Sequence, residues 1–80
     1  MAVHYDWEIA RKNMRLLRKK AGYSQEEMAQ KIYSSISMIC LYEKGATIPK
    51  IDYIERFCVY FGIGLDDLYE PDLIKGVLNL

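Results

Sequence analysis

Side chains that commonly do chemistry are few in this 80-residue chain, and they lie far apart. The two cysteines are Cys40 and Cys58, and the only histidine is His4. A nucleophile needs a neighbouring base, and a zinc site needs several cysteine or histidine ligands. The chain also lacks a CxxC pair and a glycine-rich phosphate loop. The sequence therefore predicts a protein that is not an enzyme, with two free thiols and no metal or cofactor.

The charged side chains are unevenly distributed along the chain. The net charge is zero, with 11 basic and 11 acidic residues. Residues 1–20 carry six basic and two acidic side chains, whereas residues 51–80 carry two basic and six acidic ones. A basic surface can meet phosphate groups even on a neutral protein. Charged helix faces are also common as plain solvated surface, so both interpretations stay open.

Two short helices joined by a tight turn are predicted by the run YSQEEMAQKIYSSISMICLYEKG. Ser24 is a good N-cap, and Glu27 three residues later completes a capping box. The turn is expected at residues 33–35, and the second helix at residues 35–44 with Gly45 as its stop. Such a pair forms a helix-turn-helix, whose second helix can lie in the DNA major groove. The predicted buried positions are Met28, Ala29, Ile32, Ile39 and Tyr42.

Helical patterns also flank this segment. A first helix is expected over residues 6–21, a fourth over residues 49–61, and a fifth over residues 65–69. Pro49 is expected to open the fourth helix, because the missing N–H of proline costs nothing in a first turn. The tail of residues 72–80 has the pattern of a small amphipathic helix, and no strand pattern is present. The predicted buried faces of the first and fourth helices are Ala10, Met14, Leu17 and Ala21, and Ile51, Ile54, Phe57, Cys58 and Phe61.

The order and spacing of these pieces resemble the phage repressor/Cro type of helix-turn-helix, the family named after the xenobiotic response element (XRE). The resemblance covers residues 9–69 and rests on NMRLLRKKAGYSQEEMA, YEKG, Pro49 and FGIGLDDLY. It implies an all-α, five-helix, lambda-repressor-like DNA-binding domain. We expect one domain over residues 1–80, with a core of residues 9–69 and a short C-terminal extension of residues 70–80. It also implies a homodimer that binds double-stranded DNA, and the two separate cysteines predict a cytoplasmic chain.

The resemblance assigns roles to several polar residues. Gln25 matches a glutamine that usually contacts a phosphate at the start of the second helix, where free N–H groups favour anions. Arg18 and Glu43 match an ion pair that links the first helix to the end of the third, and Arg18 also lies near the DNA backbone. Lys44 and Lys50 flank a loop that approaches the backbone. Both lysines are equally compatible with plain solvent exposure.

The positions expected to face the bases are unusually apolar. Arginine reads guanine, and glutamine or asparagine reads adenine, through paired hydrogen bonds. The serine and apolar side chains at the base-facing positions of this chain cannot make such pairs. Contacts would rest on serine hydroxyls and on thymine methyl groups, so we expect sequence-specific or AT-leaning binding with modest discrimination. Tyr33 also replaces a glycine usual in the turn, which costs about 1 kcal/mol if its φ is positive. The base-facing positions are Ser35, Ile36, Ser37, Met38, Cys40 and Leu41.

Three functions fit these observations. The favoured one is a DNA-binding transcriptional regulator, with repression as the expected effect. In the second, Ile36, Met38 and Leu41 form a protein-binding patch and DNA binding is weak or absent. In the third, the chain is an antitoxin or regulatory subunit that uses both DNA and a protein partner.

A dimer surface is predicted on the fourth helix and the tail, where aromatic and apolar side chains fall off the expected core face. The alternative is that the tail packs onto its own core. No apolar run approaches the length of a membrane span, so no membrane partner is expected. The predicted dimer residues are Tyr53, Tyr60, Leu73, Ile74, Val77 and Leu78.

Overall fold

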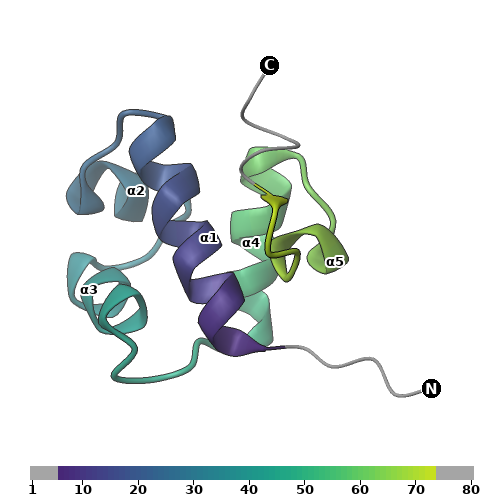
Figure 1. The fold of residues 1–80 in the computed structure, drawn as a ribbon. Coiled ribbons are helices and arrows are strands. Elements are labelled where there is room, and N and C mark those ends of the chain that lie inside the picture. The colour runs from purple at the N-terminus through teal and green to yellow at the C-terminus, as the bar shows by residue number, and fades with distance from the viewer. Residues whose placement is uncertain (1–5, 74–80) are drawn as a thin grey trace.

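The computed structural model describes residues 6–73, which form five helices and no strand (Figure 1). The all-α, five-helix prediction is confirmed. Figure 1 shows α2 and α3 on one side of α1, with α4 and α5 on the other side. α3 packs on α1 and α2, and α5 packs on α1 and α4, so α1 is the central element. The helices are α1 (Trp7–Lys20), α2 (Gln25–Lys31), α3 (Ile36–Lys44), α4 (Ile51–Phe61) and α5 (Leu65–Leu68).

The helix starts follow from local capping chemistry. The Asp6 carboxylate accepts a backbone N–H at the start of α1. The Ser24 hydroxyl accepts the Glu27 N–H at 3.0 Å, and the Glu27 carboxylate accepts the Ser24 N–H at 3.1 Å, which is the predicted capping box. Ser35 caps α3 in the same way at 3.2 Å. At its other end α3 stops at Gly45, whose φ of 81° lies in the left-handed region that glycine tolerates.

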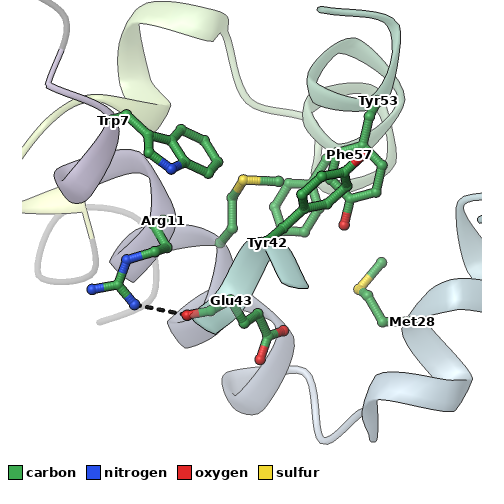
Figure 2. Close-up of a pocket in the computed structure, with 8 residues that line it drawn as sticks. Trp7, Arg11, Met28, Tyr42, Glu43, Tyr53 and Phe57 are labelled. Carbon is green, nitrogen blue, oxygen red and sulfur yellow. Dashed lines mark hydrogen bonds between the residues drawn. The ribbon is translucent and has the colours of Figure 1, made fainter. Parts of the chain in front are cut away.

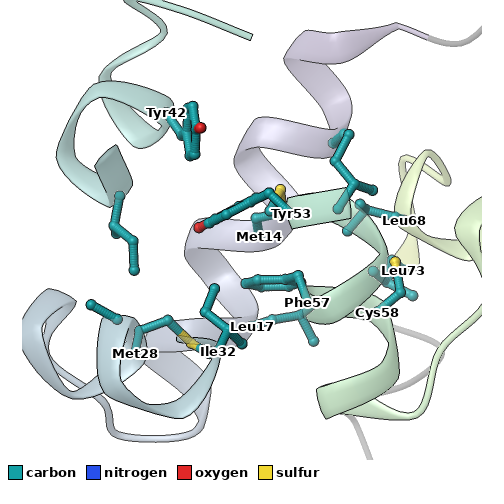
Figure 3. Packing of buried hydrophobic residues seen from close by; sticks show 14 residues of the cluster. Met14, Leu17, Met28, Ile32, Tyr42, Tyr53, Phe57, Cys58, Leu68 and Leu73 are labelled. Atoms are coloured by element: carbon teal, nitrogen blue, oxygen red, sulfur yellow. The ribbon is translucent and has the colours of Figure 1, made fainter. Parts of the chain in front are cut away.

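The buried apolar side chains of all five helices form one cluster (Figure 3). Every predicted core position of α2 and α3 is buried, and so are the first three predicted positions of α1. Ala21 was expected in the core but is exposed, because α1 ends at Lys20 and Ala21 is its C-cap. The confirmed positions are Ala10, Met14, Leu17, Met28, Ala29, Ile32, Ile39 and Tyr42.

The start of α4 differs from the prediction. Pro49 does not open the helix: it is buried one residue before the N-cap, Lys50. Ile51 is exposed, whereas Tyr53 is buried and meets the Tyr42 ring edge to face, with centroids 4.5 Å apart. The large Tyr53 ring removes more apolar surface from water than Ile51 could, so it sets which face of α4 points inward.

The predicted dimer surface is therefore partly wrong. Tyr53 lies in the core and not on the surface. Leu73 is also buried in the core cluster, in agreement with the alternative that this part of the tail packs on its own domain. Tyr60 is exposed, and its hydroxyl shares a 2.6 Å hydrogen bond with that of Tyr23. The remaining positions Ile74, Val77 and Leu78 lie outside the described residues.

Asn13 makes a buried polar link that the apolar pattern does not reveal. Its amide Nδ2 donates to the carbonyl oxygen of Leu68 at 2.7 Å and to that of Glu70 at 2.8 Å. A helix as short as α5 leaves most of its carbonyl groups without internal partners. Asn13 therefore attaches the end of α5 to α1.

The turn between α2 and α3 holds Tyr33 with φ of 55°, the only positive φ outside glycine among residues 6–73. Its side chain is 86% exposed, so packing gives little in return for the strained backbone. The expected cost of placing a non-glycine residue here thus applies.

We expect Tyr33→Gly to raise the free energy of unfolding by about 1 kcal/mol, because glycine has no Cβ to strain at positive φ. Tyr33→Ala is the matched control, since it removes the exposed ring and keeps the strain. Urea denaturation followed by circular dichroism gives the three free energies. A glycine variant no more stable than the alanine variant would contradict the strain.

Candidate nucleic-acid interface

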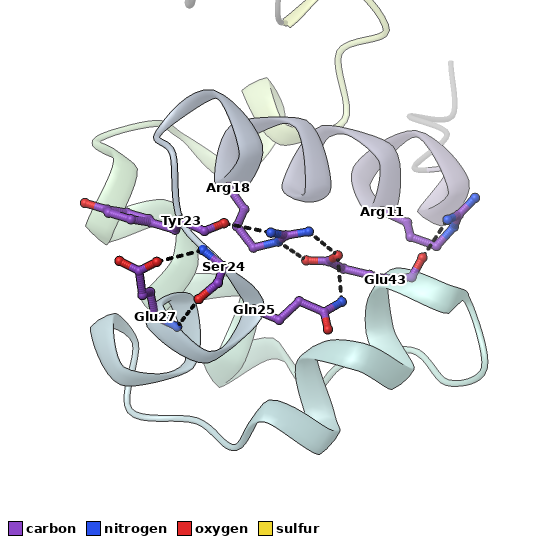
Figure 4. A network of polar contacts seen from close by, with 7 residues as sticks. All are labelled: Arg11, Arg18, Tyr23, Ser24, Gln25, Glu27 and Glu43. Carbon is purple, nitrogen blue, oxygen red and sulfur yellow. Dashed lines mark hydrogen bonds and ion pairs between the residues drawn. The ribbon is translucent and has the colours of Figure 1, made fainter.

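A buried ion pair holds the end of α3 against α1 (Figure 4). Arg18 Nε donates to Glu43 Oε2 at 2.6 Å, and Nη2 donates to Oε1 at 2.9 Å. The two side chains are only 9% and 11% exposed. Arg18 Nη1 also donates to the carbonyl oxygen of Tyr23 at 2.7 Å, which ties in the segment before α2. The pair thus joins α1, the segment before α2 and the end of α3.

Gln25, the first residue of α2, closes the same network. Its Nε2 donates to Glu43 Oε1 at 3.1 Å, so both carboxylate oxygens of Glu43 have partners within the network (Figure 4). The Gln25 side chain is half-buried. Arg18 has most of its guanidinium turned inward, which makes it a positioning residue before anything else.

Arg11 helps to position the candidate site, and sequence reasoning missed this contribution. Its Nη1 donates to the backbone carbonyl oxygen of Glu43 at 2.7 Å, at the C-terminal end of α3 (Figure 4). A cation in this place satisfies a free carbonyl and complements the helix dipole. Arg11 also pairs with Glu8 at 2.8 Å, and its hydrogen bonds lower the pKa of the Glu8 carboxyl. The only signal in the sequence was its place in the basic first helix.

The candidate base-facing residues of α3 divide into two groups. Met38 is half-buried and packs against the core, so its side chain is only partly available. Cys40 is also half-buried. The remaining four, all exposed, are Ser35, Ile36, Ser37 and Leu41.

A model of the helix-turn-helix family matches residues 14–68, which is more than half of the chain. The chain belongs to the Cro/C1-type helix-turn-helix family, also called the XRE family. Comparison with curated proteins and with solved structures gave no match. The resemblance inferred from the sequence is confirmed, and the family is one of DNA-binding regulators and not of enzymes.

Basic side chains surround the α3 surface of this helix-turn-helix. A shallow hollow of about 230 Å³ lies between the ends of α1, α2 and α3, and a second hollow of about 310 Å³ runs along α1. Arg15 lines both hollows, so the basic face of α1 continues to the edge of α3. Lys44 lines the first hollow as the last residue of α3, whereas Lys50 is exposed at the start of α4.

An interior cavity between α1, α3 and α4 does not serve as a ligand site (Figure 2). Its volume of about 10 Å³ holds at most one water molecule. Trp7 Nε1 lies buried beside it and has no hydrogen-bond partner among residues 6–73. Tyr53 also lines it, and burial raises the pKa of the Tyr53 hydroxyl.

Two further findings concern residues 6–73 only. They contain no group of three or more histidine, cysteine, aspartate or glutamate residues that could hold a metal ion. None of their helices is long and apolar enough to cross a membrane.

We expect Glu43→Ala to lower the free energy of unfolding by about 3 kcal/mol, because it leaves the Arg18 guanidinium buried without its counter-charge. Glu8→Ala is the control. It breaks the exposed pair of Glu8 with Arg11 within α1, and it should barely shift the urea midpoint. Equal midpoints for Glu43→Ala and the unchanged protein would show that the buried pair does not stabilise the fold.

Proposed function

We propose that the chain is a transcriptional regulator that binds double-stranded DNA as a homodimer, with α3 in the major groove. Membership of the Cro/C1-type family is the observation that carries this proposal. The buried network of Arg18, Gln25 and Glu43 supports it, because the network fixes α3 while leaving the outer face of α3 exposed. Two recognition helices about 34 Å apart would read a roughly palindromic operator. Repression by occupancy of the site is the expected effect.

Phosphate contacts would supply most of the affinity. Lys44 is exposed at the end of α3, and Lys50 is exposed at the start of α4. The two lysines flank the loop between these helices, where both would contact phosphates of the DNA backbone. Gln25 at the start of α2 and Arg15 on α1 extend this surface. Arg18 contributes mainly by holding Glu43. Because phosphate contacts release counterions, binding should weaken steeply as salt rises.

The dimer surface within residues 6–73 needs a new assignment. Of the predicted residues in this part, Tyr60 alone is exposed, at the end of α4. Its ring meets Phe61 edge to face and its hydroxyl shares a hydrogen bond with that of Tyr23. We retain Tyr60 as the candidate contact.

A second candidate function is the protein-binding patch. The exposed apolar side chains of Ile36 and Leu41 support it, since exposed apolar surface on a small protein often marks a partner site. An antitoxin would use both this patch and DNA.

The substitution Ile36→Arg tests the protein-binding patch. It should abolish a complex with a co-purified protein, because it places a charge in the apolar contact. An unchanged complex would exclude the patch.

The affinity for a 20-base-pair random duplex, measured by fluorescence anisotropy at several salt concentrations, tests the proposed function. We expect Lys44→Gln to reduce the slope of log affinity against log salt by about 1, as loss of one phosphate contact requires. Lys31→Gln is the matched control, because Lys31 lies over the Tyr23 ring and outside the α3 surface. Absence of salt-sensitive binding in the unchanged protein would refute DNA binding.

We also expect DNA to protect Cys40 from iodoacetamide. Cys40 is half-buried on α3, whereas Cys58 is buried in α4 and burial raises the pKa of its thiol. At a duplex concentration about ten times Kd, alkylation of Cys40 should slow by about tenfold. Peptide mass spectrometry separates the two thiols, and Cys58 should react slowly with or without duplex. Unchanged alkylation of Cys40 at saturation would contradict placement of α3 in the groove.

A further inference from the structure

The outer face of α3 presents branched aliphatic side chains to solvent. Ile36 is 48% exposed and Leu41 is 38% exposed, whereas Ile39 and Tyr42 in the same helix are buried. Ile36 is the first residue of α3 and lies at the end that a recognition helix directs to the base edges. If α3 lies in a major groove, these two side chains face the bases.

Hydrogen-bonding groups are scarce on the same face. The Ser35 hydroxyl accepts the Met38 N–H at 3.2 Å, and the Glu43 carboxylate is held by Arg18 and Gln25. Ser37 is the remaining exposed hydroxyl in the first turn of α3. No arginine, asparagine or glutamine occurs between Ile36 and Lys44, so the side chains that most often read guanine or adenine through paired hydrogen bonds are missing from α3.

The apolar group that a base pair presents in the major groove is the C5-methyl of thymine. A methyl group at C5 of cytosine occupies the equivalent edge of its ring. Contact with Ile36 and Leu41 would remove such methyl groups from water, which is favourable in proportion to the apolar area buried. We propose that α3 recognises C5-methylpyrimidines, in thymine or in 5-methylcytosine, through Ile36 and Leu41. This inference rests on the proposed function, because it requires α3 in the major groove.

The test uses one 20-base-pair duplex of mixed sequence, made in four forms. The pyrimidines are thymine with cytosine, uracil with cytosine, thymine with 5-methylcytosine, or uracil with 5-methylcytosine. All four forms carry the same phosphates, so the salt-dependent contribution cancels in their comparison. Two methyl groups buried against α3 correspond to about tenfold in affinity. We expect the duplex without C5-methyl groups to bind about tenfold more weakly than either singly methylated form.

The outcomes separate the sources of the methyl group. Equal affinity for all four forms overturns the proposal while leaving DNA binding intact. A loss on replacing thymine with uracil that 5-methylcytosine does not restore overturns the part concerning 5-methylcytosine. Failure of every form to bind in a salt-sensitive way refutes the proposed function itself, which is a different result.

Variants assign the effect to α3. The double substitution Ile36→Ser with Leu41→Ser should abolish the preference for methylated forms, so that this variant binds all four duplexes with equal affinity. Val59→Ser is the matched control, since Val59 is an exposed aliphatic residue on α4 and should keep the preference. Circular dichroism checks that all variants fold. A full preference in the double variant would overturn the assignment to these side chains.

Discussion

The structure depends on one buried ion pair, which joins Arg18 of α1 to Glu43 at the end of α3. Burying two charges is costly unless they are paired and hydrogen-bonded, and here two N–H···O bonds join the guanidinium directly to the carboxylate. The guanidinium also binds the carbonyl of Tyr23, and the carboxylate also accepts from Gln25. The end of α1, the first residue of α2 and the end of α3 therefore meet at the carboxylate of Glu43. The backbone of the same glutamate is held by Arg11, so both the side chain and the main chain fix the end of α3.

The parts of this fold that were predictable are those decided by neighbouring residues. Ser24 and Glu27 satisfy each other across three residues, and Gly45 ends α3 by adopting a conformation that few other residues tolerate. Such signals are complete within one turn of helix, so the sequence contains them in full. The family resemblance then supplied the Arg18 and Glu43 contact, which no local pattern reveals.

The errors and omissions arise where a distant partner decides the outcome. Tyr53 was assigned to the surface because helical periodicity favoured Ile51, yet the Tyr42 ring gives Tyr53 a better buried place. Nothing in the sequence marks Asn13 or Arg11 for the roles that they have in the structure. Their importance comes from carbonyl groups at the ends of α5 and α3, and the positions of those ends are set only after the helices pack.

The division between inward and outward side chains on α3 has an evolutionary consequence. Ile39, Tyr42 and Glu43 hold the helix in place, whereas Ile36 and Leu41 are exposed. The outward positions are therefore less constrained by folding than Ile39 and Tyr42, and under the proposed function a substitution there would change the DNA target before it changed the fold. On the same basis, a change of target would cost less stability than a change in the buried face of α3.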